Sequence, residues 1–168
     1  MIAYKKIPTT IKVLYTHSEY NDINGWPLLR IMWNNNIVAN IQANGSEIEF
    51  TVTNVLKSNK LTFEHYGKNH INDNDKFVEI QKIYFNNVDL DKILLQGKYY
   101  PILPPWEKQT TKPITENTYM GWNGKLVYTF KDPLMLDIQK RLGKTVKQIE
   151  GQETTRDTLN KMKNYFFN

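Results

Sequence analysis

Two groups of side chains in this 168-residue sequence have the chemistry to bind a ligand: a short run of oxygen donors and a set of aromatic rings in predicted loops. The run Asn72-Asp73-Asn74-Asp75 places several side-chain oxygens close together, as the hard cation Ca²⁺ requires. It lacks the glycine and the distal glutamate of an EF-hand loop. The same residues also suit a polar hairpin loop, because Asn and Asp favour turn geometry. We therefore take Asp73 and Asp75 as candidate calcium ligands, with a polar turn as the alternative, and expect no other cofactor.

Motifs of catalysis are missing from the sequence. It has no cysteine, which excludes disulfides, thiolate nucleophiles and thiolate zinc sites. Its three histidines, His17, His65 and His70, do not have the spacing of metal ligands, and His65 in an alternating strand is expected to be structural. There is no Gly-x-Ser-x-Gly elbow and no phosphate-binding glycine loop. A pair of carboxylates distant in sequence would still allow glycoside hydrolysis, but the prediction is that the protein is not an enzyme.

The four tryptophans fall in two kinds of setting. Trp33 lies in the core register of an alternating strand, so we expect it to pack in the interior. Trp26, Trp106 and Trp122 lie beside glycine or proline in predicted loops. Loop aromatics either stack on sugars, anchor an interface, or cap the end of a core. We take these three residues, with Tyr66, as candidate glycan-binding or interface aromatics.

The elements that would position these residues are short strands. Apolar and polar residues alternate from Ile11 to about Phe130, with turns between the alternating runs. Strands repeating about every 8–12 residues, without a long helical crossover, predict a mainly β fold, an antiparallel jelly-roll-like β-sandwich. We assign it to residues 1–131. The predicted Asn-rich turns are Asn34-Asn35-Asn36, Asn44-Gly45 and Asn86-Asn87.

Residues 132–168 are predicted to form a helical tail, either part of the same domain or an assembly arm. Asp132-Pro133 has the residue types of a helix start, with Asp as the N-cap, and Gly143 is placed to end the helix. A second helix is expected from about Thr155. An apolar stripe that its own domain does not cover marks an interface, and the alternative is packing on the sandwich. The candidate anchors of this tail interface are Leu159, Met162, Tyr165, Phe166 and Phe167.

Charge is a weak guide to function in this sequence. Lys and Arg number 22 against 17 Asp and Glu, a net charge of +5, but the lysines are scattered singly. Such scatter is typical of a solvated surface, so nucleic acid is not an expected partner. No apolar run reaches the length of a membrane span, and the N-terminus has no export signal. We therefore expect neither a membrane-spanning segment nor export through a classical signal.

The stretch from Leu29 to about Leu90 resembles small β-sandwich carbohydrate-binding modules of the calcium-dependent, xylan-binding kind. In those modules an Asp-led loop before a strand helps to hold Ca²⁺, and the resemblance implies Asp73 and Asp75 as the matching positions. In those modules the strand after this loop ends in an Asn-Gly turn. In this sequence Asn87 occupies the position of that glycine. The segments that carry the resemblance are Arg30-Ile-Met-Trp-Asn-Asn-Asn-Ile-Val, Leu61-Thr-Phe-Glu-His-Tyr-Gly, Asp73-Asn-Asp-Lys and Val78-Glu-Ile-Gln-Lys-Ile-Tyr-Phe-Asn-Asn.

A pattern that covers more of the chain is similar to small structural proteins of tailed bacteriophages, marine ones in particular. It consists of His65-Tyr-Gly-Lys, Gly97-Lys-Tyr-Tyr-Pro and Gly121-Trp-Asn-Gly. The resemblance implies a non-enzymatic virion protein of the tail, its fibres or the capsid surface, made in the host cytoplasm. Its partners would be other virion proteins and further copies of itself. The alternative hypothesis is a glycan-binding module that recognises a host surface polysaccharide, with or without Ca²⁺.

Overall fold

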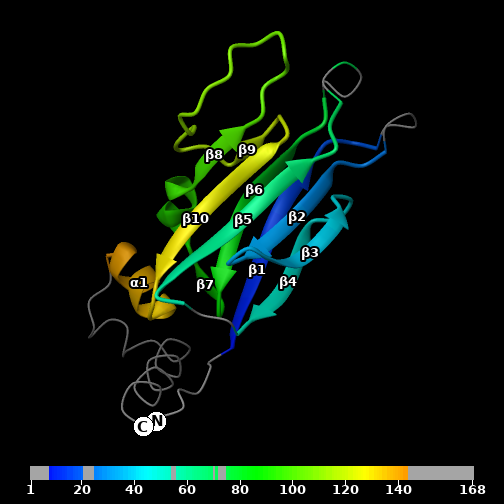
Figure 1. Ribbon diagram of the computed structural model, residues 1–168. Coiled ribbons are helices and arrows are strands. Elements are labelled where there is room, and N and C mark those ends of the chain that lie inside the picture. The colour runs from blue at the N-terminus through cyan, green and yellow to red at the C-terminus, as the bar shows by residue number, and fades with distance from the viewer. Residues whose placement is uncertain (1–7, 21–24, 54–55, 70, 72–74, 144–168) are drawn as a thin grey trace.

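The computed structural model describes residues 8–20, 25–53, 56–69, 71 and 75–143, and this part of the chain forms two antiparallel sheets packed face to face (Figure 1). The β1 sheet has the order β4-β1-β6-β7, with β9 paired to β6, and the β5 sheet has the order β3-β2-β5-β10-β8. The predicted antiparallel β-sandwich is therefore confirmed. Its strands are β1 (Thr9–His17), β2 (Leu28–Trp33), β3 (Asn36–Gln42), β4 (Glu47–Val52), β5 (Ser58–Tyr66), β6 (Val78–Phe85), β7 (Val88–Asp89), β8 (Lys98–Pro101), β9 (Tyr119–Met120) and β10 (Gly124–Lys131).

The core lies between the two sheets and is built by the alternation seen in the sequence. Trp33 is buried as predicted, and its ring meets Phe85 across the sandwich at a centroid distance of 6.2 Å. Phe85 also contacts Phe130 at 4.9 Å, so aromatic rings from both sheets join the layers. Each inward residue leaves its two neighbours on the outer face, which is how a strand presents a binding surface.

Asparagine shapes the tight hairpins, as predicted. Asn34 and Asn35 have φ values of 50° and 67° between β2 and β3, and Asn86 and Asn87 have 48° and 66° between β6 and β7. Two successive positive φ angles match the twist of a two-residue hairpin, and Asn tolerates them better than most residues. Asn44-Gly45 also lies between strands, but it joins β3 of one sheet to β4 of the other.

The helix α1 (Leu134–Arg141) follows β10 at the predicted place, but the predicted cap is wrong. The N-cap residue is Pro133, and no side chain caps the helix. Asp132 precedes the N-cap, and its backbone N–H still bonds to the carbonyl of Lys57, so its carboxylate is one residue too early for the first turn. Gly143 has a φ of 77° just beyond the helix, as a terminating glycine should.

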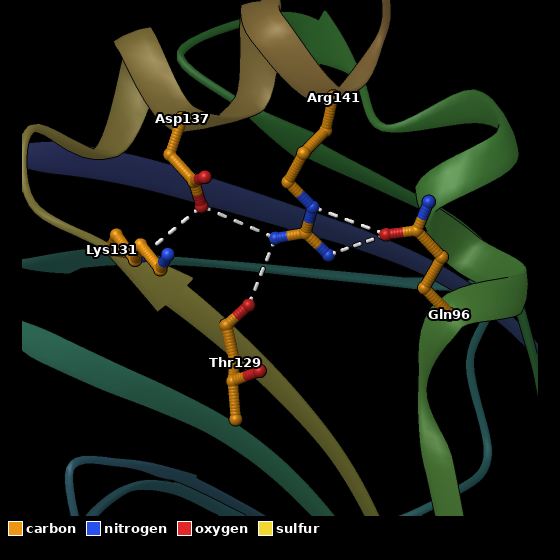
Figure 2. Close-up of polar contacts among 5 residues, drawn as sticks. All are labelled: Gln96, Thr129, Lys131, Asp137 and Arg141. Carbon is orange, nitrogen blue, oxygen red and sulfur yellow. Dashed lines mark hydrogen bonds and ion pairs between the residues drawn. The ribbon is translucent and has the colours of Figure 1, made fainter.

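Arg141 ties α1 to the sandwich (Figure 2). Its Nη1 donates to the Thr129 carbonyl at 2.9 Å, and its Nε and Nη2 donate to Gln96 Oε1 at 3.1 and 2.7 Å. Gln96 ends the short 3-10 helix η1 (Asp91–Gln96) before β8. Asp137 accepts from Arg141 at 3.3 Å and from the Lys131 backbone N–H at 3.0 Å. With Leu134, Met135 and Ile138 also buried, this first helix packs on its own sandwich.

The second predicted helix and the tail-interface residues Leu159, Met162, Tyr165, Phe166 and Phe167 lie outside the described residues. No helix within the described part is long and apolar enough to cross a membrane.

Candidate functional site

A pocket of about 460 Å³ opens on the outer face of the β5 sheet. It lies where β5 ends and β10 begins, beside the last residues of β8. Its volume falls in the range of pockets that hold small ligands. The lining residues are Glu64, His65, Tyr66, Gly67, Tyr100, Ile102, Asn123, Gly124, Lys125 and Val127.

Strand register sets the walls and floor of this pocket. Lys125 on β10 pairs with Glu64 on β5 and with Tyr100 on β8, so three outward side chains form one row across the sheet. Tyr66, one outward position beyond Glu64, gives β5 its aromatic residue, as Tyr100 does for β8. At Gly124 a Cβ atom would lie 2.4 Å from the carbonyl oxygen of Tyr100, so glycine lets β8 approach the start of β10.

Polar contacts hold Glu64 and Tyr66 in place before any ligand arrives. Arg30 Nη1 donates to Glu64 Oε1 at 2.5 Å, and the Lys125 ammonium is 3.7 Å from Glu64 Oε2. The Arg30 guanidinium lies 4.3 Å from the centroid of the Tyr66 ring, and the Tyr66 hydroxyl donates to Asn40 Oδ1. Side chains fixed in this way lose little conformational freedom when a ligand binds.

The pocket combines two tyrosine rings with a carboxylate, an ammonium group and the amide of Asn123. Such a surface fits a ligand that has apolar C–H faces and polar edges, since the rings stack and the polar groups bond. Glu64 is the one carboxylate among the lining residues, and it already bonds to Arg30. Glycoside hydrolysis normally takes two carboxylates about 5–9.5 Å apart, so this pocket, as described, does not have that arrangement.

His65 lies directly beneath the pocket with its ring turned into the core. It is fully buried, and its Nδ1 lies 3.0 Å from the Met120 carbonyl of the β1 sheet, while Nε2 has no partner among the described residues. Burial lowers the pKa of His65 to about 4, and the nearby ammonium groups of Lys68 and Lys76 act in the same direction. The ring is therefore neutral at pH 7, donates from Nδ1, and has a structural role, as expected from the sequence.

None of the predicted loop tryptophans is among the residues that line the pocket. Trp26 is half-buried and packs edge-on against His17 at 5.3 Å. Trp122 is half-buried, with the Lys68 ammonium 4.8 Å from its ring centroid. Trp106 is exposed in the long loop after β8. Of the four predicted aromatics, Tyr66 alone lines the pocket.

Sequence reasoning missed Glu64, Tyr100, Ile102, Asn123 and Lys125. Alternation in Lys98-Tyr99-Tyr100 does indicate that one tyrosine points inward and the next outward. It does not indicate that β8 pairs with β10, which is what brings Tyr100 to Lys125.

The predicted calcium loop is only partly described. Asp75 is exposed, and Asp73 lies outside the described residues. Within the described part, no group of three or more His, Cys, Asp or Glu side chains gathers to hold a metal ion. A cation of the protein itself lies nearby: the buried Lys68 ammonium donates to the carbonyls of Lys76, at 3.1 Å, and Gly121.

Comparisons with known proteins find likeness in three-dimensional structure only. No protein-family model matches the chain, and no curated protein sequence matches it significantly. The solved structure of vCBM60 in complex with galactobiose is 12% identical, with a TM-score of 0.48, over 71% of this chain and 96% of that one. A selenomethionine form of vCBM60, described with a circular-permutation link between two families of calcium-dependent carbohydrate-binding modules, is 12% identical with a TM-score of 0.49, over 71% and 89%.

Proposed function

We propose that this protein is a non-catalytic glycan-binding module that holds part of a sugar chain in the pocket on the outer face of the β5 sheet. The observation that carries the proposal is the placement of Tyr66 and Tyr100 on either side of β10, with Glu64 and Lys125 between them. Of the two hypotheses from the sequence, this is the glycan-binding one.

The chemistry of sugars supports this use of the pocket. A pyranose ring has C–H faces that pack against aromatic rings and hydroxyl groups that both donate and accept hydrogen bonds. Glu64 offers acceptors and Lys125 offers donors. The Asn123 amide bonds to the Lys68 backbone through both Oδ1 and Nδ2, which holds it in place and leaves it one further N–H and one further lone pair. Tyr100 keeps 43% of its surface exposed, so its ring has contact area to give to a ligand.

The test compares two tyrosines of almost equal exposure on opposite sheets. Tyr100, 43% exposed, lines the pocket, and Tyr119, 44% exposed, lies on β9 of the β1 sheet. The full chain and the variants Tyr100→Ala and Tyr119→Ala would be screened against a panel of neutral and acidic polysaccharides by affinity electrophoresis. Calorimetry would then measure each binding constant. We expect Tyr100→Ala to weaken binding at least tenfold, because a centrally placed aromatic residue contributes about 2 kcal/mol or more, and Tyr119→Ala to change it little. Absence of binding to every polymer, or equal losses from both variants, would refute the proposal.

Calcium at Asp73 and Asp75 stays a prediction, and comparing the melting temperature in Ca²⁺ and in a chelator tests it. A location on a phage particle and virion partners also stay predictions, because no contact among the described residues bears on them.

A further inference from the structure

The outer face of the β5 sheet is basic. Outward positions on its strands carry five basic side chains and one acidic side chain. These residues are Arg30, Lys60, Lys98, Lys125 and Lys131, with Glu64 as the acid.

The outer face of the β1 sheet has the opposite balance. Its outward positions carry two basic and four acidic side chains. They are Lys12 and Lys82, with Glu47, Glu49, Glu79 and Asp89. The positive charge is therefore gathered on the face that has the pocket.

Most of this positive charge is not neutralised within the protein. Glu64 is shared by Arg30 and Lys125, at 2.5 and 3.7 Å. Lys60, Lys98 and Lys131 make no ion pair with any described residue, and each is exposed. Exposed ammonium groups on one face set up a positive potential that attracts a polyanion.

The lysines extend from the pocket along the sheet. Lys125 lines the pocket, and Lys131 lies six residues further along β10, about 20 Å away at the rise of an extended strand. Lys98 is next to Val127 of β10 in the register of β8, and Lys60 is next to Thr129 in the register of β5. We call Lys60, Lys98, Lys125 and Lys131 the lysine track.

We propose that the ligand of this face is an acidic polysaccharide, with one sugar in the pocket and the anionic groups of its neighbours along the lysine track. The inference rests on the proposed glycan-binding function and names the class of glycan. The anionic groups are carboxylates of uronic acids or sulfate esters, because either one binds ammonium groups through charge-assisted hydrogen bonds.

A polysaccharide fits this face better than a nucleic acid does. Grooves that bind single-stranded nucleic acid stack successive bases on aromatic side chains along the strand. Here the two outward rings of the strands, the half-buried Tyr66 and the exposed Tyr100, both line the pocket, and the outward positions between the lysines of the track carry Thr62, Val127 and Thr129.

The experiment separates charge from sugar recognition with two matched polymers. Polygalacturonate carries a carboxylate on every sugar, and its methyl ester has the same backbone with these charges blocked. Heparin provides the sulfated case, and a single-stranded oligonucleotide provides the nucleic acid. Binding of each to the full chain would be measured by calorimetry at low ionic strength and again near 1 M salt, where charges are screened within about 3 Å.

Two triple variants complete the design. Lys60→Gln/Lys98→Gln/Lys131→Gln removes the track but leaves Lys125 in the pocket. Lys12→Gln/Lys82→Gln/Lys92→Gln removes the same charge elsewhere, from the β1 sheet and η1. We expect the track variant to bind the acidic polymer roughly tenfold more weakly, because each exposed pair adds a few-fold. The control variant should bind it as the unaltered chain does.

The outcomes distinguish failure of this inference from failure of the proposed function. Binding to polygalacturonate or heparin that is lost at high salt and is weakened roughly tenfold in the track variant supports the inference and identifies the anionic group. Equal binding to polygalacturonate and its methyl ester, or binding to neutral polymers alone, overturns the acidic class but leaves glycan binding. Tighter binding of the oligonucleotide through the track makes the partner a nucleic acid. No binding to any polymer overturns both proposals.

Discussion

The two outer faces of this sandwich come from strands of the same kind but differ in what they present. The β5 sheet carries five basic and one acidic side chain around a pocket with two tyrosines, and the β1 sheet carries two basic and four acidic side chains. Neither face is visible as a block of charge in the sequence. The difference teaches that alternation along separate strands can gather scattered residues on one side of a fold.

The faces also differ in how their charges are held. On the β5 sheet, Glu64 is 16% exposed and contacts two cations. On the β1 sheet, Lys12 and Glu47 form a single contact at 3.4 Å, and the lysine is 39% exposed. The contacts of Glu64 therefore form a preorganised site, and the Lys12–Glu47 contact is an ordinary surface ion pair. The measurements proposed below test this difference between the two faces.

The largest expected effect is a decrease in the free energy of unfolding at acid pH, caused by His65 of the β5 sheet. His65 supports that sheet from beneath the pocket and bonds to Met120 of the other sheet. Burial lowers the pKa of His65 from 6.5 to about 4, so the unfolded chain takes up a proton between these values while the folded protein does not. Its contribution to stability is complete above pH 6.5, decreases as the pH falls, and is lost by about pH 4. The loss should approach about 3 kcal/mol.

Urea unfolding at a series of pH values would measure this effect. The variant His65→Gln should be less stable overall but should lose the fall between pH 6.5 and 4, and His17→Gln should retain it. An unchanged pH profile in His65→Gln would show that the acid sensitivity comes from another part of the molecule.

Replacing one carboxylate on each face gives the next largest effect. Glu64→Gln removes the anion that Arg30 contacts at 2.5 Å, and Arg30 already has a buried Nε without a hydrogen-bond partner among the described residues. We expect this variant to lose about 1–2 kcal/mol of unfolding free energy. Glu49→Gln, at an exposed position of β4, should stay within about 0.5 kcal/mol. Equal losses in urea unfolding would mean that the two faces are held alike.

The sandwich was predictable from the sequence because the alternation of apolar residues in the strands and the turn residues between them indicate the same fold. The alternation of apolar and polar residues indicates which side of β5 faces the core. Two hairpins are indicated by asparagine pairs that tolerate positive φ, Asn34-Asn35 and Asn86-Asn87. The helix start was located to within one residue, because Pro133 has the φ of a first helical turn and cannot continue a strand ladder. The error in the cap, by one residue, came from β10, whose last backbone contacts extend to Asp132.

The pocket was not predictable by the same reasoning, because it depends on which strands pair. Tyr100 and Glu64 are 36 positions apart in the chain and meet through Lys125 of β10 in the registers of two different pairs. The lysine track was missed for the same reason, since Lys60, Lys98 and Lys131 are far apart in sequence. Loop tryptophans were the more visible candidates, but Trp26 and Trp122 are half-buried, Trp106 is exposed, and none of the three lines the pocket.

The smallest expected effect concerns the exposed ion pair between Lys12 and Glu47 on the β1 sheet. Lys12→Gln removes its contact with Glu47, in which the Lys12 and Glu47 side chains are both exposed. Water and salt screen such a pair, so we expect a loss of about 0.5 kcal/mol or less at low ionic strength. The loss should vanish near 1 M salt, where the screening length is about 3 Å. Urea unfolding of Lys12→Gln at the two salt concentrations tests this. A loss as large as that of Glu64→Gln, or one that persists at high salt, would show that the acidic face also holds its charges in a fixed network, and the contrast between the two faces would then be one of sign alone.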